Sequence, residues 1–361
     1  STHAADVLQT VHYMLETGRV RTYLEGMEIF AMLVAAMVHD MGHDGCNNAY
    51  HKNAVTPRAL QFNDQSIQEN YHLSMLFSAM KDESKAINIL KSFTTEEYVE
   101  IRRMMISMVL ATDMSRHFVL TKEFKELAEN FGANVELWNE SHDQLMCTVL
   151  HACDISNPAK PLALARTWAG RCMNEFFRQG DMELERGLNV SPQCNRDTTF
   201  VPTSQVAFIK FVVFPTMEAM GDFLPEVATT CMPIIQSNLE YWTDQEAKEL
   251  QQHKERMASL GFSQHSPRAA GTPRGALFAH PPFRSRTSSS HEGLPDGNDH
   301  LGEQTNHSEM NQSDCDRVGS TAPLIAVPSP AVRSKRPSGS TDRSSSLLGG
   351  VGEGCEDEEG E

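Results

Sequence analysis

The chain has 361 residues, a formal net charge of −17 and a hydrophobic fraction of 40%. Nucleic acid backbones are bound by basic surfaces, so this acidic balance argues against a nucleic acid partner. The longest apolar run, Ile29 to Val38, is too short to cross a bilayer, and nothing resembles a signal peptide. Eight cysteines without a Cys-x-x-Cys pair indicate free thiols in a reducing compartment. The composition therefore excludes a membrane span and favours a cytoplasmic protein.

Residues 1–262 have the pattern of consecutive helices. Apolar positions recur three and four residues apart around residues 7–15, 104–109 and 208–212. The segment 94–97, Thr-Thr-Glu-Glu, combines a hydroxyl cap with acids in the first turn, which is typical of a helix start. Helix boundaries are predicted at four prolines: Pro57, Pro158, Pro192 and Pro215. Few alternating runs suggest strands, so we predict an all-α fold, a compact bundle of many helices.

Residues 263–361 differ sharply in composition. They are rich in Ser, Pro and Gly, contain few aromatic residues and end in the acidic run 353–361. Such a segment cannot bury enough apolar surface to offset the entropy of ordering it. We therefore predict one folded domain over residues 1–262 and a disordered tail over residues 263–361.

The most informative segment is 38–45, Val-His-Asp-Met-Gly-His-Asp-Gly, which follows the apolar run. It sets the imidazole of His39 beside the carboxylate of Asp40. If the helix continues, His43 shares the face of His39 one turn later. His3 and Asp154 add the same residue types at distant positions. Each alone has an ordinary alternative, because an isolated His is more often structural and Asp154 could cap a helix.

Together, these four residues match the chemistry of a metal centre. Zn²⁺ takes about four nitrogen or oxygen ligands, and His3, His39, Asp40 and Asp154 offer two imidazoles and two carboxylates. Asp40 could also bridge to a second, harder ion such as Mg²⁺ or Mn²⁺. Two ions can clamp a phosphoryl group and activate water. The set therefore predicts hydrolysis of a phosphoester by a hydroxide that bridges the metals.

Eight segments also carry a family resemblance. In the order of the chain they are HAADVLQT, VHDMGHDG, QENYH, ATDMSRH, HACDISNPAK, EFFRQGD, GLNVSPQC and SQVAFIKF, within residues 1–245. This region resembles the catalytic domain of class I 3′,5′-cyclic-nucleotide phosphodiesterases and looks most like the calcium/calmodulin-dependent class. The resemblance implies hydrolysis of cyclic AMP, cyclic GMP or both to 5′-monophosphates, which ends their signal.

The resemblance also implies roles for individual residues. His3, His39, Asp40 and Asp154 match zinc ligands, with Asp40 shared with the second ion. Three further residues match positions that hold waters of that second ion: His43, Glu69 and Thr112.

Substrate recognition is assigned by the same resemblance. Gln205 matches a glutamine whose amide can both donate to and accept from a purine edge. Phe208 would stack on one face of the purine and Phe176 would pack on the other, although periodicity alone makes both ordinary core residues. Asn157 matches a position that contacts the nucleotide. The choice between cyclic AMP and cyclic GMP stays open.

The chain departs from the family pattern at several positions. Tyr71 stands where the family has the first His of Glu-Asn-His-His, Asn195 replaces an Asp, and Cys172 replaces a larger aliphatic residue. The expected general acid, a His four residues before His3, would lie upstream of Ser1. The family's first helices and any calmodulin-binding segment would lie upstream as well, so we expect the chain to be an N-terminally truncated catalytic domain.

Two other functions remain open from the residues alone. Another HD-type phosphohydrolase, acting on nucleoside triphosphates or alarmones, would share the His and Asp set but would have no need of Gln205 and Phe208. A catalytically weak nucleotide-binding fragment would keep the fold without turnover.

Overall fold

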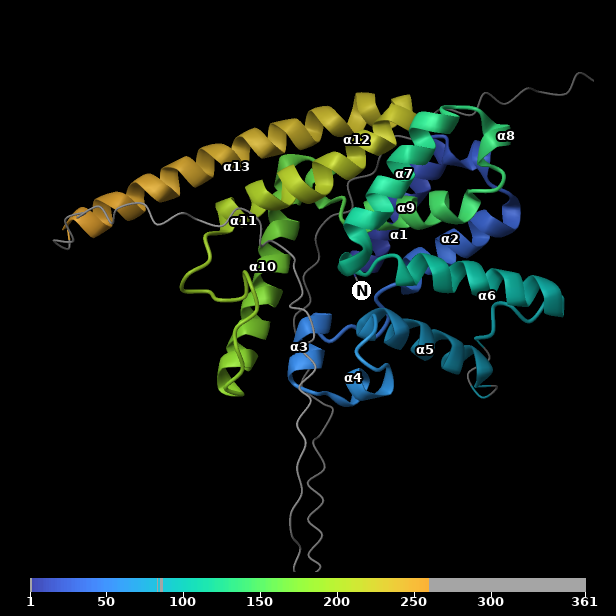
Figure 1. Cartoon of the computed structure of the whole chain (residues 1–361), viewed down its shortest axis with the longest axis horizontal. Coiled ribbons are helices and arrows are strands. Elements are labelled where there is room, and N and C mark those ends of the chain that lie inside the picture. Colours follow the sequence, from blue (N-terminus) through green and yellow to red (C-terminus); the bar gives the residue numbers. More distant parts are fainter. Residues whose placement is uncertain (1, 83, 85–86, 260–361) are drawn as a thin grey trace, which may run out of the picture. The chain divides into compact units, whose positions relative to one another are not determined.

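The computed structural model describes residues 2–82, 84 and 87–259. Helices and their connecting turns and loops make up this part, and it contains no strand (Figure 1). The all-α prediction is therefore confirmed. The predicted tail, residues 263–361, lies outside the described residues, and so does the predicted boundary at 262.

The helices are numbered along the chain. Those before residue 117 are α1 (Thr2–Glu16), η1 (Val20–Tyr23), α2 (Gly26–Val38), α3 (Asn48–Asn53), α4 (Pro57–Gln61), α5 (Ile67–Lys81), α6 (Thr95–Leu110) and η3 (Met114–Arg116). Those after it are α7 (His117–Phe131), α8 (Val135–Trp138), α9 (His142–Asp154), η4 (Asn157–Ala159), α10 (Leu162–Glu185), α11 (Val201–Phe208), η5 (Ile209–Val213), α12 (Phe214–Phe223) and α13 (Pro225–Ser259). No helix in the described part of the chain is both long and apolar enough to span a membrane.

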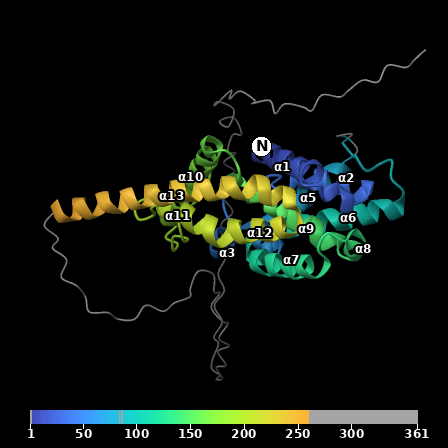
Figure 2. The same cartoon turned by 90° about the horizontal axis from the view of Figure 1, so that it is seen from above.

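The core lies where the helices pack on one another. Helix α2 packs against α1 and α6, α6 and α7 pack against α9, and α13 lies along α11 and α12 (Figure 2). The rings of Trp138 and Phe223 lie 4.4 Å apart between centroids, and Phe124 contacts both. Because these rings are almost completely buried, removing one would cost roughly 3–5 kcal/mol of stability. This packing fixes the ends of α1, α2 and α9, where the candidate site lies.

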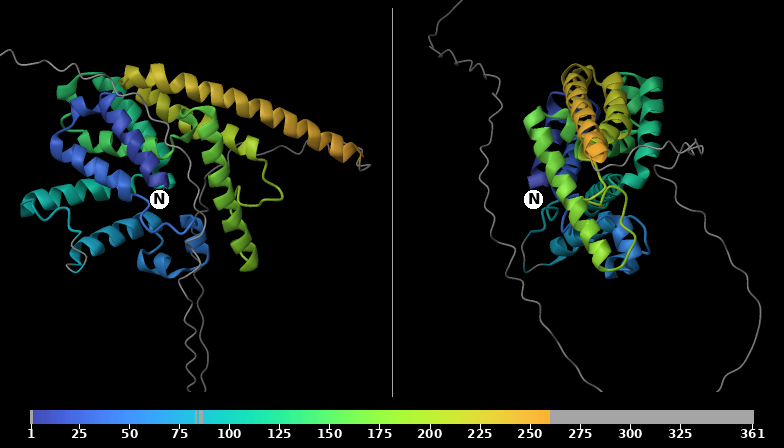
Figure 3. Two further views of the ribbon diagram at one scale, coloured as in Figure 1. Left: turned by 180° about the vertical axis from the view of Figure 1, so that it is seen from behind. Right: turned by 90° about the vertical axis from the view of Figure 1, so that its left-hand side faces the viewer.

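Helix α10 extends from this core toward α3 (Figure 3). The link at its far end is polar, because the Asn47 backbone N–H donates to Oε1 of Gln179 at 2.9 Å. Asn47 is the N-cap of α3 and lies two residues after the predicted metal segment, 38–45. Helix α10 thus contacts the chain just after that segment.

Two sequence predictions concern helix ends. Thr94 caps α6 in a capping box with Glu97, which confirms the predicted start. The His-Asp pair lies at the end of a helix, as expected, because α2 ends at Val38 and His39 is its C-cap; the helix does not continue to His43. Gly42 has a φ of +77°, a left-handed conformation that stops a right-handed helix. His43 therefore lies on a loop.

Candidate metal centre

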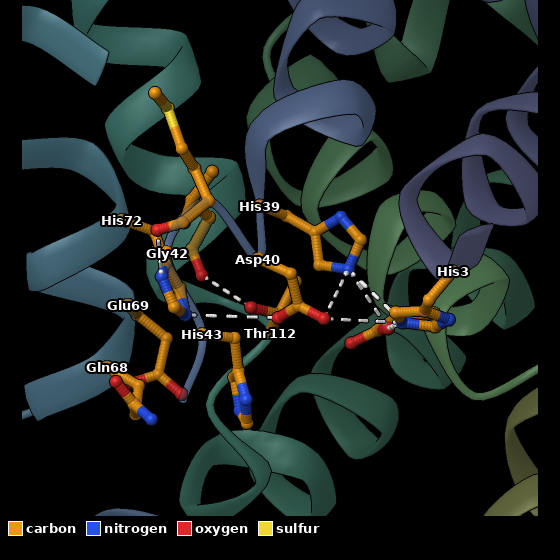
Figure 4. Close-up of polar contacts among 12 residues, drawn as sticks. His3, His39, Asp40, Gly42, His43, Gln68, Glu69, His72 and Thr112 are labelled. Atoms are coloured by element: carbon orange, nitrogen blue, oxygen red, sulfur yellow. Dashed lines mark hydrogen bonds and ion pairs between the residues drawn. The ribbon is translucent and has the colours of Figure 1, made fainter. Parts of the chain in front are cut away.

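Four side chains meet where α1, α2 and α9 come together (Figure 4). Nε2 of His3 lies 2.8 Å from Oδ1 of Asp154 and 3.4 Å from Nε2 of His39. Nε2 of His39 lies 3.3 Å from the same Asp154 oxygen. Oδ2 of Asp40 is 3.6 Å from Nε2 of both histidines. Residues separated by as many as 151 positions therefore present their ligand atoms to one point.

These distances fit a bound cation. An ion held tetrahedrally at about 2.1 Å from each ligand atom separates those atoms by roughly 3.4 Å. The observed separations, 2.8 to 3.6 Å, surround that value. Two imidazole nitrogens and two carboxylates suit a divalent ion of borderline hardness. The structure thus contains a candidate divalent metal site.

His39 is oriented toward that point by the backbone. Its Nδ1 donates to the Ala36 carbonyl at 2.9 Å, which directs Nε2 toward Asp40 and Asp154. Burial alone lowers the pKa of His39, but the Asp154 and Asp40 carboxylates outweigh burial and raise it to about 9. Burial alone raises the pKa of Asp154, but His39 and His3 hold it far below its usual value. The positive form of His39 and the negative form of Asp154 therefore stabilise each other.

A second group of polar side chains lies on the other side of Asp40 (Figure 4). His72 on α5 donates from Nδ1 to the Met41 carbonyl at 2.8 Å, and its Nε2 faces Oδ1 of Asp40 at 3.8 Å. Its ring stacks on that of His43, with centroids 5.7 Å apart. Asp40 therefore has one oxygen toward the first group and one toward the second.

Glu69 and Thr112 complete this second group. Oε2 of Glu69 accepts from the Asn48 amide at 2.9 Å. Burial raises the pKa of Glu69 to about 7, and the negative Asp113 adds to the rise. The Thr112 hydroxyl donates to the Val109 carbonyl at 2.7 Å, which leaves its oxygen free to accept. Figure 4 shows all three residues expected to hold metal waters, His43, Glu69 and Thr112, around Asp40.

Sequence reasoning assigned no role to His72. Its spacing from Glu69 could have identified it, because residues three apart share a helix face and His72 lies three residues after Glu69.

The predicted substrate residues lie on separate helices. Gln205 is buried on α11, and Phe208 follows one turn later, half-buried at the end of that helix. Phe176 is half-buried on α10, and Asn157 begins η4, three residues after Asp154. Within the described residues no ring contact joins Phe176 to Phe208. Their pairing around a purine is therefore still a prediction.

A helical fold with an imidazole–carboxylate centre defines a class of metal-binding domains, and comparison with known proteins identifies the family. The sequence profile of the 3′,5′-cyclic nucleotide phosphodiesterase family matches residues 1–234. The chain belongs to this family.

Individual relatives agree with the profile. A probable 3′,5′-cyclic phosphodiesterase of Caenorhabditis elegans is 43% identical over 225 residues, which cover 62% of this chain and 32% of the relative. The dual specificity calcium/calmodulin-dependent phosphodiesterase 1 of Drosophila melanogaster is 39% identical, over 65% of this chain and 27% of its own length. The 3′,5′-cyclic-AMP phosphodiesterase 4C of Rattus norvegicus is 37% identical, over 67% and 46%. The chain thus spans less than half of the length of each of these relatives.

Solved structures show the same similarity. The phosphodiesterase domain of a rhodopsin phosphodiesterase from Salpingoeca rosetta matches with a TM-score of 0.65 and 29% identity, over 71% of this chain and 77% of that chain. The phosphodiesterase LmjPDEB1, solved in complex with IBMX, matches with a TM-score of 0.63 and 31% identity, over 68% and 73%. Both support the helical fold.

Proposed function

We propose that this chain hydrolyses 3′,5′-cyclic nucleotides to 5′-monophosphates and so ends cyclic-nucleotide signals in the cytoplasm. The observation that carries the proposal is the convergence of His3, His39, Asp40 and Asp154 in a chain of the cyclic-nucleotide phosphodiesterase family. The catalytic domain would comprise residues 1–262, with residues 263–361 as its tail.

The four converging residues would hold Zn²⁺, and Asp40 would share Mg²⁺ or Mn²⁺ with the waters held by His43, Glu69 and Thr112. When bound, such ions stabilise phosphoryl charge and lower the pKa of an attacking water. The chain's own part is to orient these groups. The Ala36 carbonyl fixes the ring of His39, and the Met41 carbonyl fixes that of His72. The Asn48 amide fixes the carboxylate of Glu69.

Base recognition would fall to Gln205 and Phe208. A buried amide that loses its water must find partners, and a purine edge supplies a donor and an acceptor in one plane. A base stacked on Phe208 would add roughly 1–3 kcal/mol. Phe176 would cover the opposite face, and Asn157 would contact the nucleotide beside Asp154. Either purine fits these roles, so the substrate is cyclic AMP, cyclic GMP or both.

Regulation by calmodulin belongs to the same proposal. It rests on the sequence segments that look most like the calcium/calmodulin-dependent class and on the calcium/calmodulin-dependent relative in Drosophila. None of the residues discussed for the site is assigned to calmodulin binding.

The test is a hydrolysis assay on the full chain supplied with Zn²⁺ and Mg²⁺. The substrates are cyclic AMP, cyclic GMP and bis(4-nitrophenyl) phosphate. The last has a leaving group that needs no proton, so it reports on the metal centre apart from any general acid. Asp154→Ala should lower turnover of every substrate by more than about 100-fold, because it removes a ligand of the reacting centre.

Gln205→Ala separates base recognition from chemistry. It should raise KM for the cyclic nucleotides and leave the nitrophenyl diester unaffected. Asp244→Ala, at an exposed acid of α13, is the matched control and should change neither substrate class. A folded, metal-loaded chain that hydrolyses none of the three substrates would refute the proposed function.

A further inference from the structure

Arg58, in α4, contacts both the 38–45 segment and helix α5. Its guanidinium donates to Oε1 of Gln68 at 2.7 Å and pairs with Oδ2 of Asp44 at 3.1 Å. It also donates to the Gly42 carbonyl at 3.3 Å. The guanidinium carbon lies 3.7 Å from the centroid of the Tyr71 ring. One side chain therefore contacts the loop between His39 and Cys46 and helix α5 at once.

Gln68 closes this connection from the side of α5. Its amide donates to Oδ1 of Asp44 at 2.8 Å and to the Cys46 carbonyl at 2.7 Å. Gln68 is 3% exposed, so these bonds are protected from water. His51 reaches the same Asp44 oxygen at 3.3 Å. Asp44 is thus held by three side chains that come from three separate helices.

The backbone hydrogen bonds of this loop are short-range turns, from Met41 N–H to the Val38 carbonyl at 2.9 Å and from His43 N–H to the Asp40 carbonyl at 3.1 Å. Both Gly42 and Gly45 have positive φ, at +77° and +80°, and α2 has already ended at Val38. A Cβ on Gly42 would lie 3.1 Å from the Tyr71 ring, so the loop and this ring are in close contact. Rigid packing against α5 therefore replaces helical hydrogen bonding here.

The residues next to these contacts face the metal centre. Gln68 precedes Glu69, and Tyr71 precedes His72, whose Nε2 lies 3.8 Å from Asp40. On the loop side, Gly42 and Asp44 flank His43. The contacts of Arg58 thus set how far Asp40 and His43 lie from Glu69 and His72. The presence of Tyr at position 71, where the family resemblance expects His, supplies the ring on which the guanidinium stacks.

We propose that Arg58 is a positioning residue for the second divalent ion, acting through Asp44, Gln68 and Tyr71 to hold the Asp40 loop against α5. The inference rests on the proposed function, because it assumes that Asp40 and Glu69 serve that ion. It predicts that Arg58 controls affinity for the ion without touching it. Outer residues that orient metal ligands typically change metal affinity about 10- to 100-fold when they are replaced.

The test measures binding of Mn²⁺ to the Zn²⁺-loaded full chain by electron paramagnetic resonance, with no substrate present. Arg58→Ala should raise the Kd for Mn²⁺ about 10- to 100-fold. Arg102→Ala is the matched control, because Arg102 also stacks on a ring of α5, that of Phe77 at 3.8 Å, but among the described residues no hydrogen bond or ion pair joins it to the 38–45 segment. This control should bind Mn²⁺ like the wild type.

Variants of Tyr71 provide an independent test of the same proposal. Tyr71→Ala should weaken Mn²⁺ binding, and Tyr71→Phe, which keeps the ring, should restore it. Where Arg58→Ala does not fold, Arg58→Lys takes its place, since it keeps the charge but cannot bridge and stack as the planar guanidinium does.

The outcomes separate the two proposals. Wild-type Mn²⁺ affinity in a folded Arg58 variant, even one with a lowered melting temperature, overturns the positioning role and leaves the proposed function standing. A wild-type chain that binds Zn²⁺ but no Mn²⁺ overturns this inference together with the second metal of the proposed function.

Discussion

Gly180 lies where α10 meets the segment that leads into α11. A Cβ at this position would fall 1.9 Å from the Cys194 carbonyl oxygen, which is backbone and cannot move aside cheaply. Three residues further along α10, the buried Glu183 carboxylate accepts from the Ser191 N–H at 2.7 Å and from its hydroxyl at 2.5 Å. These contacts hold the 191–194 segment against α10.

Replacing Gly180 with Ala should therefore destabilise the protein. We expect a loss of about 3 kcal/mol in the free energy of unfolding, because an overpacked backbone contact has to open. Denaturant unfolding followed by circular dichroism measures this loss. Gly170→Ala on the same helix is the control: nothing lies within 4 Å of its Cβ, so it should gain about 0.5–1 kcal/mol. Equal stability of the two variants would contradict the close contact.

At the residue scale, the four converging side chains were predictable from the sequence, and the residues that support them were not. His3, His39, Asp40 and Asp154 carry metal chemistry in their residue types, so composition and order could single them out. Arg58 carries no such signal. Its place between Asp44 and Gln68 depends on a turn-rich path on both sides of it, in which Val55, Asn63 and Ser66 all have positive φ. Non-glycine residues rarely adopt that conformation, so local preference does not predict the path.

At the scale of elements, α7 and α9 meet through two buried histidines. Nδ1 of His117 and Nε2 of His151 share a hydrogen bond of 2.8 Å. Burial lowers the pKa of His117 to about 4, and His151 adds to the effect. Burial also lowers the pKa of His151, although Asp154 and Asp113 oppose it. Both rings are therefore neutral at pH 7.

This pair should make stability fall in mild acid. Between pH 6.5 and about 4, the unfolded chain protonates His117 and the folded chain does not. The free energy of unfolding then drops by about 1.4 kcal/mol per pH unit for this group as pH falls. His117→Asn should flatten the pH dependence of denaturant unfolding in that window. His12→Asn, at an exposed position of α1, should leave it unchanged, and an unchanged slope in both variants would argue against a buried neutral His117.

The helices also show where the spacing of apolar residues is sufficient to predict a helix and its ends, and where it is not. The amphipathic helices around residues 7–15 and 104–109 are present as predicted, because burial of one apolar face determines them. Pro215 marks no break between separate helices. The π-helical turn η5 precedes it, and the chain stays helical from Val201 to Phe223. The wider π-helical turn accommodates Pro215, and the spacing of apolar residues does not predict such a turn.

At the scale of the whole molecule, the candidate metal centre joins parts of the chain that are distant in sequence. His3 lies in the first turn of α1, His39 is the C-cap of α2 and Asp154 ends α9, and each helix is otherwise held by apolar packing. An ion bound to all of them connects these helices only in the folded state, because the unfolded chain does not bring the ligands together. Metal binding should therefore contribute to the stability of the whole helical domain.

Removing the metal should lower the melting temperature. At a free Zn²⁺ concentration 100 times the Kd, binding stabilises the folded state by about 2.7 kcal/mol. For a domain of this size, that difference corresponds to a shift of roughly 5–10 °C. Calorimetry of the full chain with Zn²⁺ and with a chelator measures it. His3→Ala should melt at the same temperature in both conditions, because it lacks one ligand, whereas Arg102→Ala should keep the wild-type difference. A wild-type chain that melts identically with and without the chelator would show that the four side chains converge without binding an ion, since an ion shared by three helices cannot leave the folded state without a cost in stability.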